Sequence, residues 1–154
     1  MNNEPLLVVR MNDASGGAAI DQDRIADVLD FAYRSKRKTP AVIDILVAGD
    51  LEMARLNRRH LNKDTPTDVL AFDDGEDEDG RIRLGDIAVG FEVAMREAGE
   101  RGVPFADELL FYALHGLFHL LGMRDDDDAE RAEMHKAQAK AMRDFGIEIA
   151  DNFF

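Results

Sequence analysis

The chain lacks cysteine altogether, and its four prolines and 12 glycines form no linker-like tract among its 154 residues. Without cysteine the protein has no disulfides and no thiolate metal sites, which suits a reducing cytosol, so we expect a cytoplasmic protein. The sequence does not open with a basic region followed by a long apolar run, so no signal peptide is expected. Its longest apolar stretch is shorter than the roughly 18 residues that indicate a membrane span, which predicts no membrane association.

The charge is strongly acidic, because 32 acidic and 19 basic residues give a net charge of −13. Non-specific nucleic-acid binding needs cations that face phosphates, so this balance taken alone argues against it. A nucleic-acid role would therefore need a local basic surface or a metal ion. Charge is unevenly spread: six acidic residues lie among positions 73–79, and basic residues gather at 34–38 and 55–63.

Apolar spacing and helix caps divide the chain into strands and helices. Pro104 opens the most apolar helix, and Gly122 is the natural residue to follow its C-cap. With no internal repeat or linker, we predict one α+β domain over residues 1–154. Its mixed four-stranded sheet would pack with about five helices, and a central apolar helix would carry two histidines. The expected strands are 5–11, 41–48, 68–72 and 83–91, the last two forming a hairpin, and the expected helices are 20–37, 50–61, 91–102, 104–121 and 128–145.

The segment LLFYALHGLFHLLG, residues 109–122, is apolar except for His115 and His119. Their spacing of four residues places both imidazoles on one helix face, where they can grip one metal ion. The alternative is that each histidine is simply a hydrogen-bonded core residue, but the pair on an apolar helix favours the metal. Gly116 costs helix stability relative to alanine, which indicates that something packs close to the backbone there.

A catalytic metal site needs a third protein ligand and an open position. Asp125 is the first carboxylate after the turn at Gly122, so it is the candidate third ligand. The next three aspartates, residues 126–128, are better explained as a solvated loop and an N-cap of the last helix. His135, on that last helix, is expected to be a surface or half-buried residue rather than a ligand.

Three sequence blocks resemble the YbeY family, the bacterial endoribonucleases of rRNA maturation. HGLFHLLG at 115–122, followed by Asp125, resembles the family signature H-G-x-L-H-L-x-G-Y-D-H. LNKDTPTDVLAF at 61–72 resembles the segment R-x-K-D-x-P-T-D-V-L-S-F, and LGDIAV at 84–89 resembles the strand L-G-D-I-x-I. The blocks occur in the family's order, so the resemblance covers most of the chain.

The resemblance implies an α+β fold and a metal-dependent, single-strand-specific endoribonuclease. It would act in 16S rRNA 3′-end maturation and ribosome quality control, with ribosomal RNA and the ribosome or its proteins as partners. It also implies that His115 and His119 bind one divalent metal ion, expected to be zinc. The family's third histidine falls on Asp125, whose carboxylate is a legitimate zinc ligand but shifts preference towards manganese or another harder metal.

Other positions depart from the family pattern. The family's arginine falls on Leu61, which cannot bind phosphate, so Arg58, Arg59 or Lys63 nearby are the candidate phosphate-binding residues. Ala71 replaces the usual serine. The sequence identifies no general base, and we expect a monomer.

Asp68 and Asp86 match family positions, and a structural role as hydrogen-bond acceptors at strand ends is the favoured interpretation for both.

Two rival functions remain open. The changes at Leu61 and Asp125 would suit a family member with reduced or altered activity that binds the ribosome. A small metalloprotease-like hydrolase is the other rival. Zinc proteases with the motif H-E-x-x-H use its glutamate as general base, and position 116 is glycine here.

Overall fold

The computed structural model describes residues 4–18, 20–61, 67–150 and 153, and in them five helices and a mixed sheet form a single α+β domain. The predicted elements are found within a few residues of their expected bounds. The strands are β1 (Leu7–Asp13), β2 (Ala41–Ala48), β3 (Val69–Asp73), β4 (Asp77–Glu78) and β5 (Arg81–Gly90). The helices are α1 (Gln22–Arg34), α2 (Asp50–Leu61), α3 (Phe91–Arg101), α4 (Phe105–Leu120) and α5 (Asp128–Phe145).

The sheet has the strand order β1-β2-β5-β3, so β1 and β3 are its edges. β1 pairs with β2 and β2 with β5 in parallel, whereas β3 runs antiparallel to β5. β3 and β5 are the predicted hairpin arms, and the two-residue strand β4 within the acidic connection also pairs with β5. The mixed sheet is therefore confirmed, with β4 added to its four long strands.

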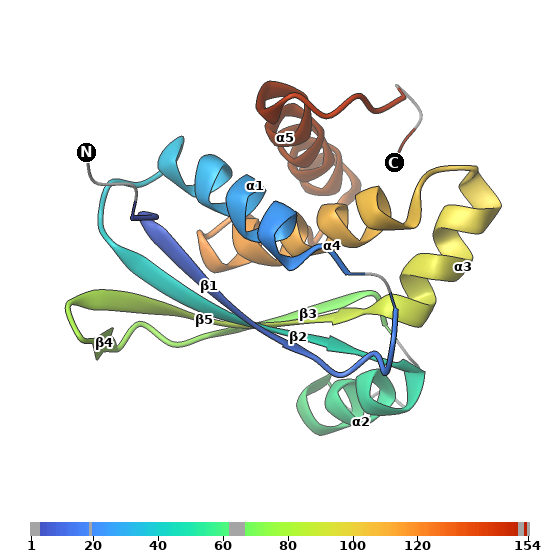
Figure 1. Cartoon of the computed structure of the whole chain (residues 1–154), viewed down its shortest axis with the longest axis horizontal. Helices are drawn as coiled ribbons and strands as arrows, with labels where there is room; N and C mark the ends of the chain where they lie inside the picture. Colours follow the sequence, from blue (N-terminus) through green and yellow to red (C-terminus); the bar gives the residue numbers. More distant parts are fainter. Residues whose placement is uncertain (1–3, 19, 62–66, 151–152, 154) are drawn as a thin grey trace.

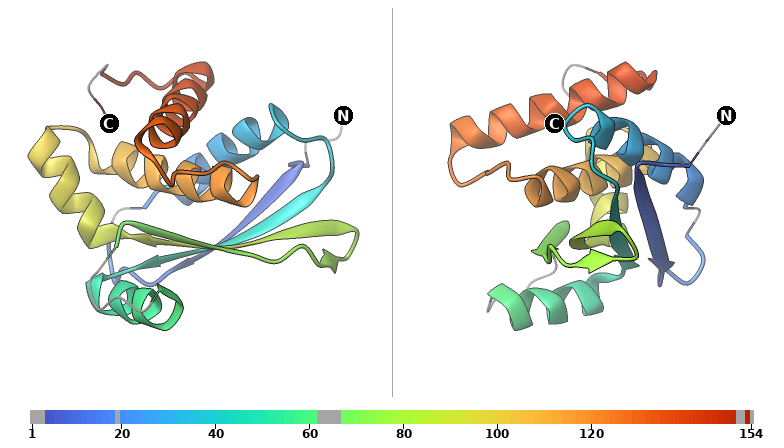
Figure 2. Two further views of the ribbon diagram at one scale, coloured as in Figure 1. Left: turned by 180° about the vertical axis from the view of Figure 1, so that it is seen from behind. Right: turned by 90° about the vertical axis from the view of Figure 1, so that its left-hand side faces the viewer.

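The helices form unequal layers on the two faces of the sheet (Figures 1 and 2). α1 and α4 cover one face, and α5 lies on the far side of α4, so α4 is enclosed between the sheet and another helix. α3 packs against α4 at one end, while α2 lies on the opposite face of the sheet. This arrangement explains why α4 is apolar nearly all round, since a helix covered on most sides needs no polar face.

Gly116 is a point of close contact between α4 and β5. A Cβ added there would lie 2.6 Å from Cγ2 of Ile87, a β-branched side chain that is itself only 1% exposed. The sequence-based expectation of a close approach at this glycine is thus confirmed. The absence of a side chain lets α4 pack directly on the sheet and sets the position of the histidines on either side of this contact.

The turn after α4 is fixed by backbone hydrogen bonds. Gly122 has φ +99°, and its N–H donates to the His119 carbonyl (3.0 Å), while the Met123 N–H donates to the Phe118 carbonyl (2.9 Å). These two bonds are the Schellman motif that commonly ends a helix at glycine. Because the chain reverses here, Asp125 returns to the end of α4.

Two arginines of the sheet pair with carboxylates of the acidic connection between β3 and β5. Arg83 pairs with Asp74 (2.6 Å) and Asp44 (2.8 Å), and Arg10 pairs with Asp44 (2.7 Å) and Glu78 (2.8 Å). The hydrogen bonds from Arg10 and Arg83 hold the pKa of Asp44 below its usual range despite its partial burial. The local excess of negative charge therefore meets positive charge from neighbouring strands.

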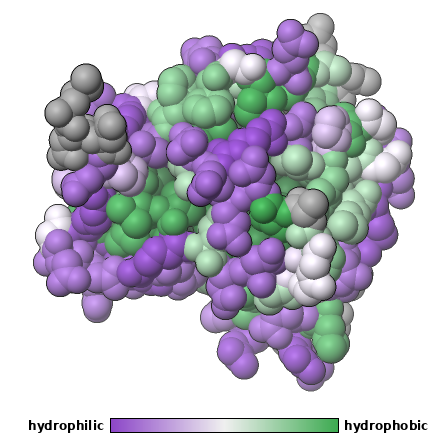
Figure 3. Space-filling view, viewed as in Figure 1, coloured by the Kyte–Doolittle hydropathy of each residue, from purple (hydrophilic) through white to green (hydrophobic). Residues whose placement is uncertain are grey.

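The surface agrees with the composition. Hydrophilic side chains cover much of the face seen in Figure 3, and hydrophobic ones appear between them in separate patches. In the part of the chain that the structure describes, no helix combines the length and apolar character that crossing a bilayer requires.

The contact at Gly116 predicts that two Gly→Ala substitutions change the free energy of unfolding in opposite directions. Gly116→Ala should lower the free energy of unfolding by about 1–2 kcal/mol, because overpacking against Ile87 outweighs the helix propensity gained. Gly99→Ala is the matched control, since Gly99 also lies within a helix, α3, and an added Cβ there meets nothing within 4 Å. It should raise stability by up to about 1 kcal/mol. Urea unfolding followed by circular dichroism measures both, and equal gains would refute the close contact.

Candidate metal centre

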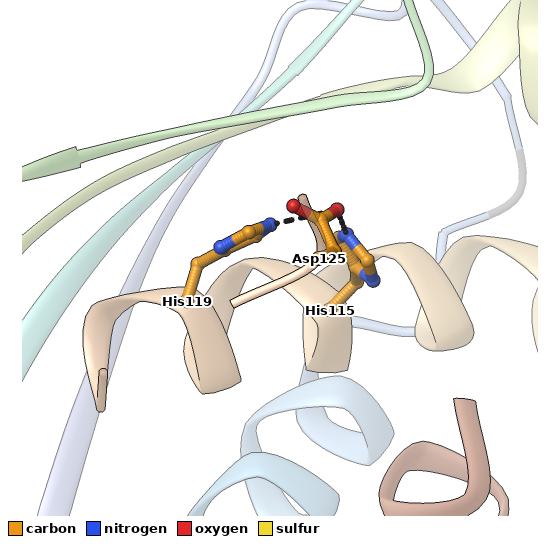
Figure 4. A group of neighbouring side chains, drawn as sticks. All are labelled: His115, His119 and Asp125. Atoms are coloured by element: carbon orange, nitrogen blue, oxygen red, sulfur yellow. Dashed lines mark hydrogen bonds and ion pairs between the residues drawn. The ribbon is translucent and has the colours of Figure 1, made fainter. Parts of the chain in front are cut away.

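His115, His119 and Asp125 converge at the C-terminal end of α4 and form what we call the His–His–Asp group (Figure 4). Oδ2 of Asp125 lies 3.0 Å from Nε2 of His115 and 3.2 Å from Nε2 of His119. One ligand atom from each residue can be chosen such that all three lie within 4.8 Å of one another. The predicted pair and the predicted third residue are therefore brought together by the fold.

Gln138 of α5 sets the orientation of the His115 ring. Its side-chain nitrogen donates to the Phe111 carbonyl (2.9 Å), which leaves its oxygen facing Nδ1 of His115 at 3.0 Å. Nδ1 must then carry the hydrogen and donate it. Nε2 is left with its lone pair directed at the other two members of the group, which is the tautomer that binds a metal.

Asp125 is ionised and points its carboxylate between the two imidazoles. Partial burial opposes ionisation, but His119 and His115 outweigh it and hold the pKa of Asp125 below its usual range. Its neighbours follow the sequence-based interpretation, because Asp127 accepts a hydrogen bond from the Glu130 N–H (2.8 Å) and caps α5, and Asp128 begins that helix. Within this loop, Asp125 therefore belongs to the His–His–Asp group, whereas Asp127 and Asp128 form the start of α5.

The chemistry and spacing of the His–His–Asp group fit a divalent metal ion. A tetrahedral zinc site with bonds of about 2.1 Å places neighbouring ligand atoms about 3.4 Å apart. The contacts of 3.0 and 3.2 Å around Asp125 are close to that spacing. Two imidazoles and one carboxylate also form a donor set that zinc and manganese both accept.

A cleft of about 800 Å³ opens over this group, and we call it the histidine cleft. Edge strand β3 forms one wall and the end of α4 the other, while the last two residues of α2 complete the rim. Among the described residues that line it there is no lysine or arginine. Its lining consists of His60, Leu61, Thr67, Asp68, Val69, Leu70, Ala71, Phe72, Asp73, His115, His119, Leu120, Asp125 and Asp126.

The candidate phosphate-binding residues have different positions. Arg58 and Arg59 are exposed on α2 but are not among the residues that line the histidine cleft, so their role stays a prediction. Lys63 lies outside the described residues. Leu61, at the position of the family arginine, does line the cleft and is 55% exposed.

Asp68 and Asp86 lie on different sides of the sheet. The carboxylate of Asp68 accepts a hydrogen bond from the Val69 N–H (2.8 Å) where β3 begins, and the residue also lines the histidine cleft. Asp86 pairs with Arg83 and lines a different hollow, beside α2. Asp68 thus has the expected role of an acceptor at a strand end, whereas Asp86 lies within β5 and accepts from Arg83 instead.

His135 is half-buried, and its ring centroid lies 6.1 Å from that of His115. Burial and the neighbouring His115 lower its pKa, so the imidazole is neutral near pH 7. It stands beside the His–His–Asp group without joining it.

Sequence reasoning missed Gln138, although a signal was present. The side chain is fully buried on α5 between the buried Met134 and Met142, each four residues away. A polar residue in an apolar helical stripe must find a hydrogen-bond partner. That anomaly indicates a polar contact in the core but does not name His115 as its partner.

Comparison with known proteins agrees with these observations. The model of a protein family described as Endoribonuclease YbeY matches residues 18–146. An Endoribonuclease YbeY from Geobacter metallireducens is 38% identical over 108 residues, covering 68% of this chain and 71% of the relative. Another from Bacillus pumilus is 29% identical and covers 92% of this chain and 96% of its own length. The solution structure of TM1509 from Thermotoga maritima has a TM-score of 0.57 at 23% identity, covering 94% and 98% of the two chains, which shows a shared fold.

The contact between Gln138 and His115 predicts weaker metal binding by Gln138→Met. The variant keeps much of the side-chain volume but removes the acceptor for Nδ1, so the metal dissociation constant should rise about 10–100-fold. Competition with a chromogenic chelator measures the constant. Gln22→Met, on the exposed surface of α1, is the control and should leave it unchanged. Equal affinities in all three proteins would show that Gln138 does not tune the site.

A second prediction separates Asp125 from its neighbours. Asp125→Ala should weaken metal binding by at least about a hundredfold, because a direct ligand contributes more than an outer partner. Asp125→His should retain binding, since imidazole is also a zinc ligand. Asp126→Ala, which removes an exposed carboxylate of the same loop, should bind as the parent does. Parent-like affinity in Asp125→Ala would exclude it as the third ligand.

Proposed function

This chain belongs to the YbeY endoribonuclease family, and we propose that it is a metal-dependent hydrolase that cuts single-stranded RNA. The family membership supports hydrolase and nuclease activity. The observation that carries the proposal is the His–His–Asp group, which opens into the histidine cleft and offers two nitrogens and one carboxylate oxygen to a single ion. We propose zinc as that ion, with manganese as the alternative that the carboxylate favours.

The residues around the cleft would have different roles in such a reaction. His115, His119 and Asp125 would hold the ion, and Gln138 would keep Nε2 of His115 available to it. A bound divalent ion supplies charge against a phosphate oxygen and acidifies water. Residues of β3 line the cleft along its length, and an extended RNA strand would lie beside them.

The charge of the cleft makes the ion necessary. Asp68, Asp73 and Asp126 line it besides Asp125, and its described lining contains no lysine or arginine. Phosphates would be repelled from this surface without a cation. RNA binding at the cleft should therefore depend on the metal.

We further propose that the substrate is ribosomal RNA, cut in 16S rRNA 3′-end maturation and ribosome quality control in the cytoplasm. Family membership supports this role, with the ribosome or its proteins as partners. A family member with altered activity that only binds the ribosome is the second candidate, favoured by Leu61 in the cleft at the position of the family arginine. A protease of the H-E-x-x-H type is disfavoured, because it needs a glutamate at position 116. This chain has glycine there, and even a Cβ at that position would clash with Ile87.

The proposal predicts metal-dependent cleavage of single-stranded RNA. Protein purified free of contaminating nucleases, and supplied with zinc or manganese, should cut labelled single-stranded RNA and leave a duplex of the same sequence intact. Chelation, or the variant His119→Ala, should lower the rate at least about a hundredfold, since a metal contributes several kcal/mol to such reactions. Glu133→Ala, which removes an exposed carboxylate of α5 that does not line the cleft, should behave as the parent does.

The same assay decides between the two candidates. It includes ribosomal particles that carry unprocessed 16S rRNA as a second substrate. If metal-loaded protein cuts neither substrate but still binds the particles, the nuclease proposal is rejected. The ribosome-binding candidate then remains.

A further inference from the structure

A second hollow, of about 480 Å³, adjoins the histidine cleft, and we call it the side pocket. Its walls come from α3, α4, α5 and the start of β3, and they include Asp68, Glu97, Phe111, Tyr112, His115 and His135. His115 and residues 67–69 line both hollows, so the side pocket opens directly beside the His–His–Asp group. Its volume is within the range of about 300–1,000 Å³ that is usual for small-ligand sites.

Aromatic rings form much of the pocket wall. Phe111 and Tyr112 are neighbours on α4, and the ring centroid of His135 lies 5.7 Å from that of Phe111. Proteins that bind single-stranded RNA place unstacked bases against such rings.

The charge of the pocket determines which part of a nucleotide can enter. Arg101 is the one arginine or lysine among its described lining residues, and it pairs with the fully buried Glu108 and donates to the Phe153 carbonyl. The exposed carboxylates of Glu97 and Asp68 are left to set the sign of the potential. A phosphate would be repelled here, whereas a neutral base would not.

Carboxylates also distinguish among the bases. An ionised carboxylate only accepts hydrogen bonds, and the exocyclic amino group of cytosine, adenine or guanine donates them. Uracil has no such amino group. Its one donor on that edge, N3–H, lies between two carbonyl oxygens, which a carboxylate repels. The pocket therefore suits bases that carry an exocyclic amino group.

We propose that the side pocket holds a nucleobase with an exocyclic amino group, from the nucleotide next to the phosphodiester at the His–His–Asp group. Glu97 accepts the hydrogen bond from that amino group, and the aromatic wall contacts the base. This inference rests on the proposed RNA substrate and adds a base preference to it.

The test uses metal-loaded protein and three labelled single-stranded octamers: all cytidine, all uridine, and a cytidine octamer with one central abasic residue. The parent should cut the cytidine octamer about tenfold faster than the uridine one, measured as kcat/KM. Fluorescence anisotropy of the uncleavable 2′-deoxy versions should show the same preference, with the deoxycytidine octamer bound more tightly than the deoxyuridine one. The abasic octamer keeps every phosphate and should bind about tenfold more weakly than its cytidine parent.

Glu97→Gln is the decisive variant, because an amide both donates and accepts at an exposed position that the fold tolerates. Its preference for cytidine over uridine should fall below about threefold, with metal content unchanged. Glu100→Gln is the matched control, since Glu100 is exposed on the same helix and does not line the pocket. It should keep the parent's preference.

The two proposals fail in different ways. Equal cleavage of the cytidine and uridine octamers, or unchanged binding of the abasic one, would overturn the base site and leave the nuclease standing. An unchanged preference in Glu97→Gln would overturn the role of Glu97. If no octamer is cut, the nuclease proposal fails, and the affinities for the deoxy octamers still decide whether the pocket selects a base.

Discussion

The close contact between α4 and β5 is the constraint on which the site depends. Residue 116 has no side chain, so the helix lies against Ile87 and is buried from the sheet side. His115 and His119 lie on either side of that position along the chain. Both side chains line the histidine cleft, opposite edge strand β3. The depth at which the helix packs thus decides whether the imidazoles open into the cleft.

A single short connection then serves three purposes. It ends α4 with a glycine turn, carries Asp125 back to the histidines, and caps α5 through Asp127. Because α5 begins at this point and folds over α4, its buried Gln138 reaches His115 from the side opposite Asp125. The ring is therefore fixed on both sides: Nδ1 donates to Gln138 of the next helix, and Nε2 faces the Asp125 carboxylate that the turn supplies.

Charge organises the rest of the surface around this site. The protein is acidic, and the described lining of the histidine cleft has carboxylates but no lysine or arginine, so a divalent ion is the natural counter-charge for a phosphate. In the adjoining side pocket the described arginine is neutralised by a buried glutamate. Phosphate and base would thus be directed to neighbouring hollows by the sign of the potential in each.

The sequence by itself determined the elements and the core of the site. Helix periodicity, caps and glycine turns depend on residues within one or two turns, so α2, α5 and the histidine pair could be read from local pattern, as could the return of Asp125 after Gly122. Only the tertiary structure decided that Gln138 meets His115, 23 residues away, and that Leu61 rather than Arg58 or Arg59 lines the cleft. It also decided that three helices and a strand enclose the side pocket. Such contacts depend on how distant elements pack, and no local spacing encodes which side chains then meet.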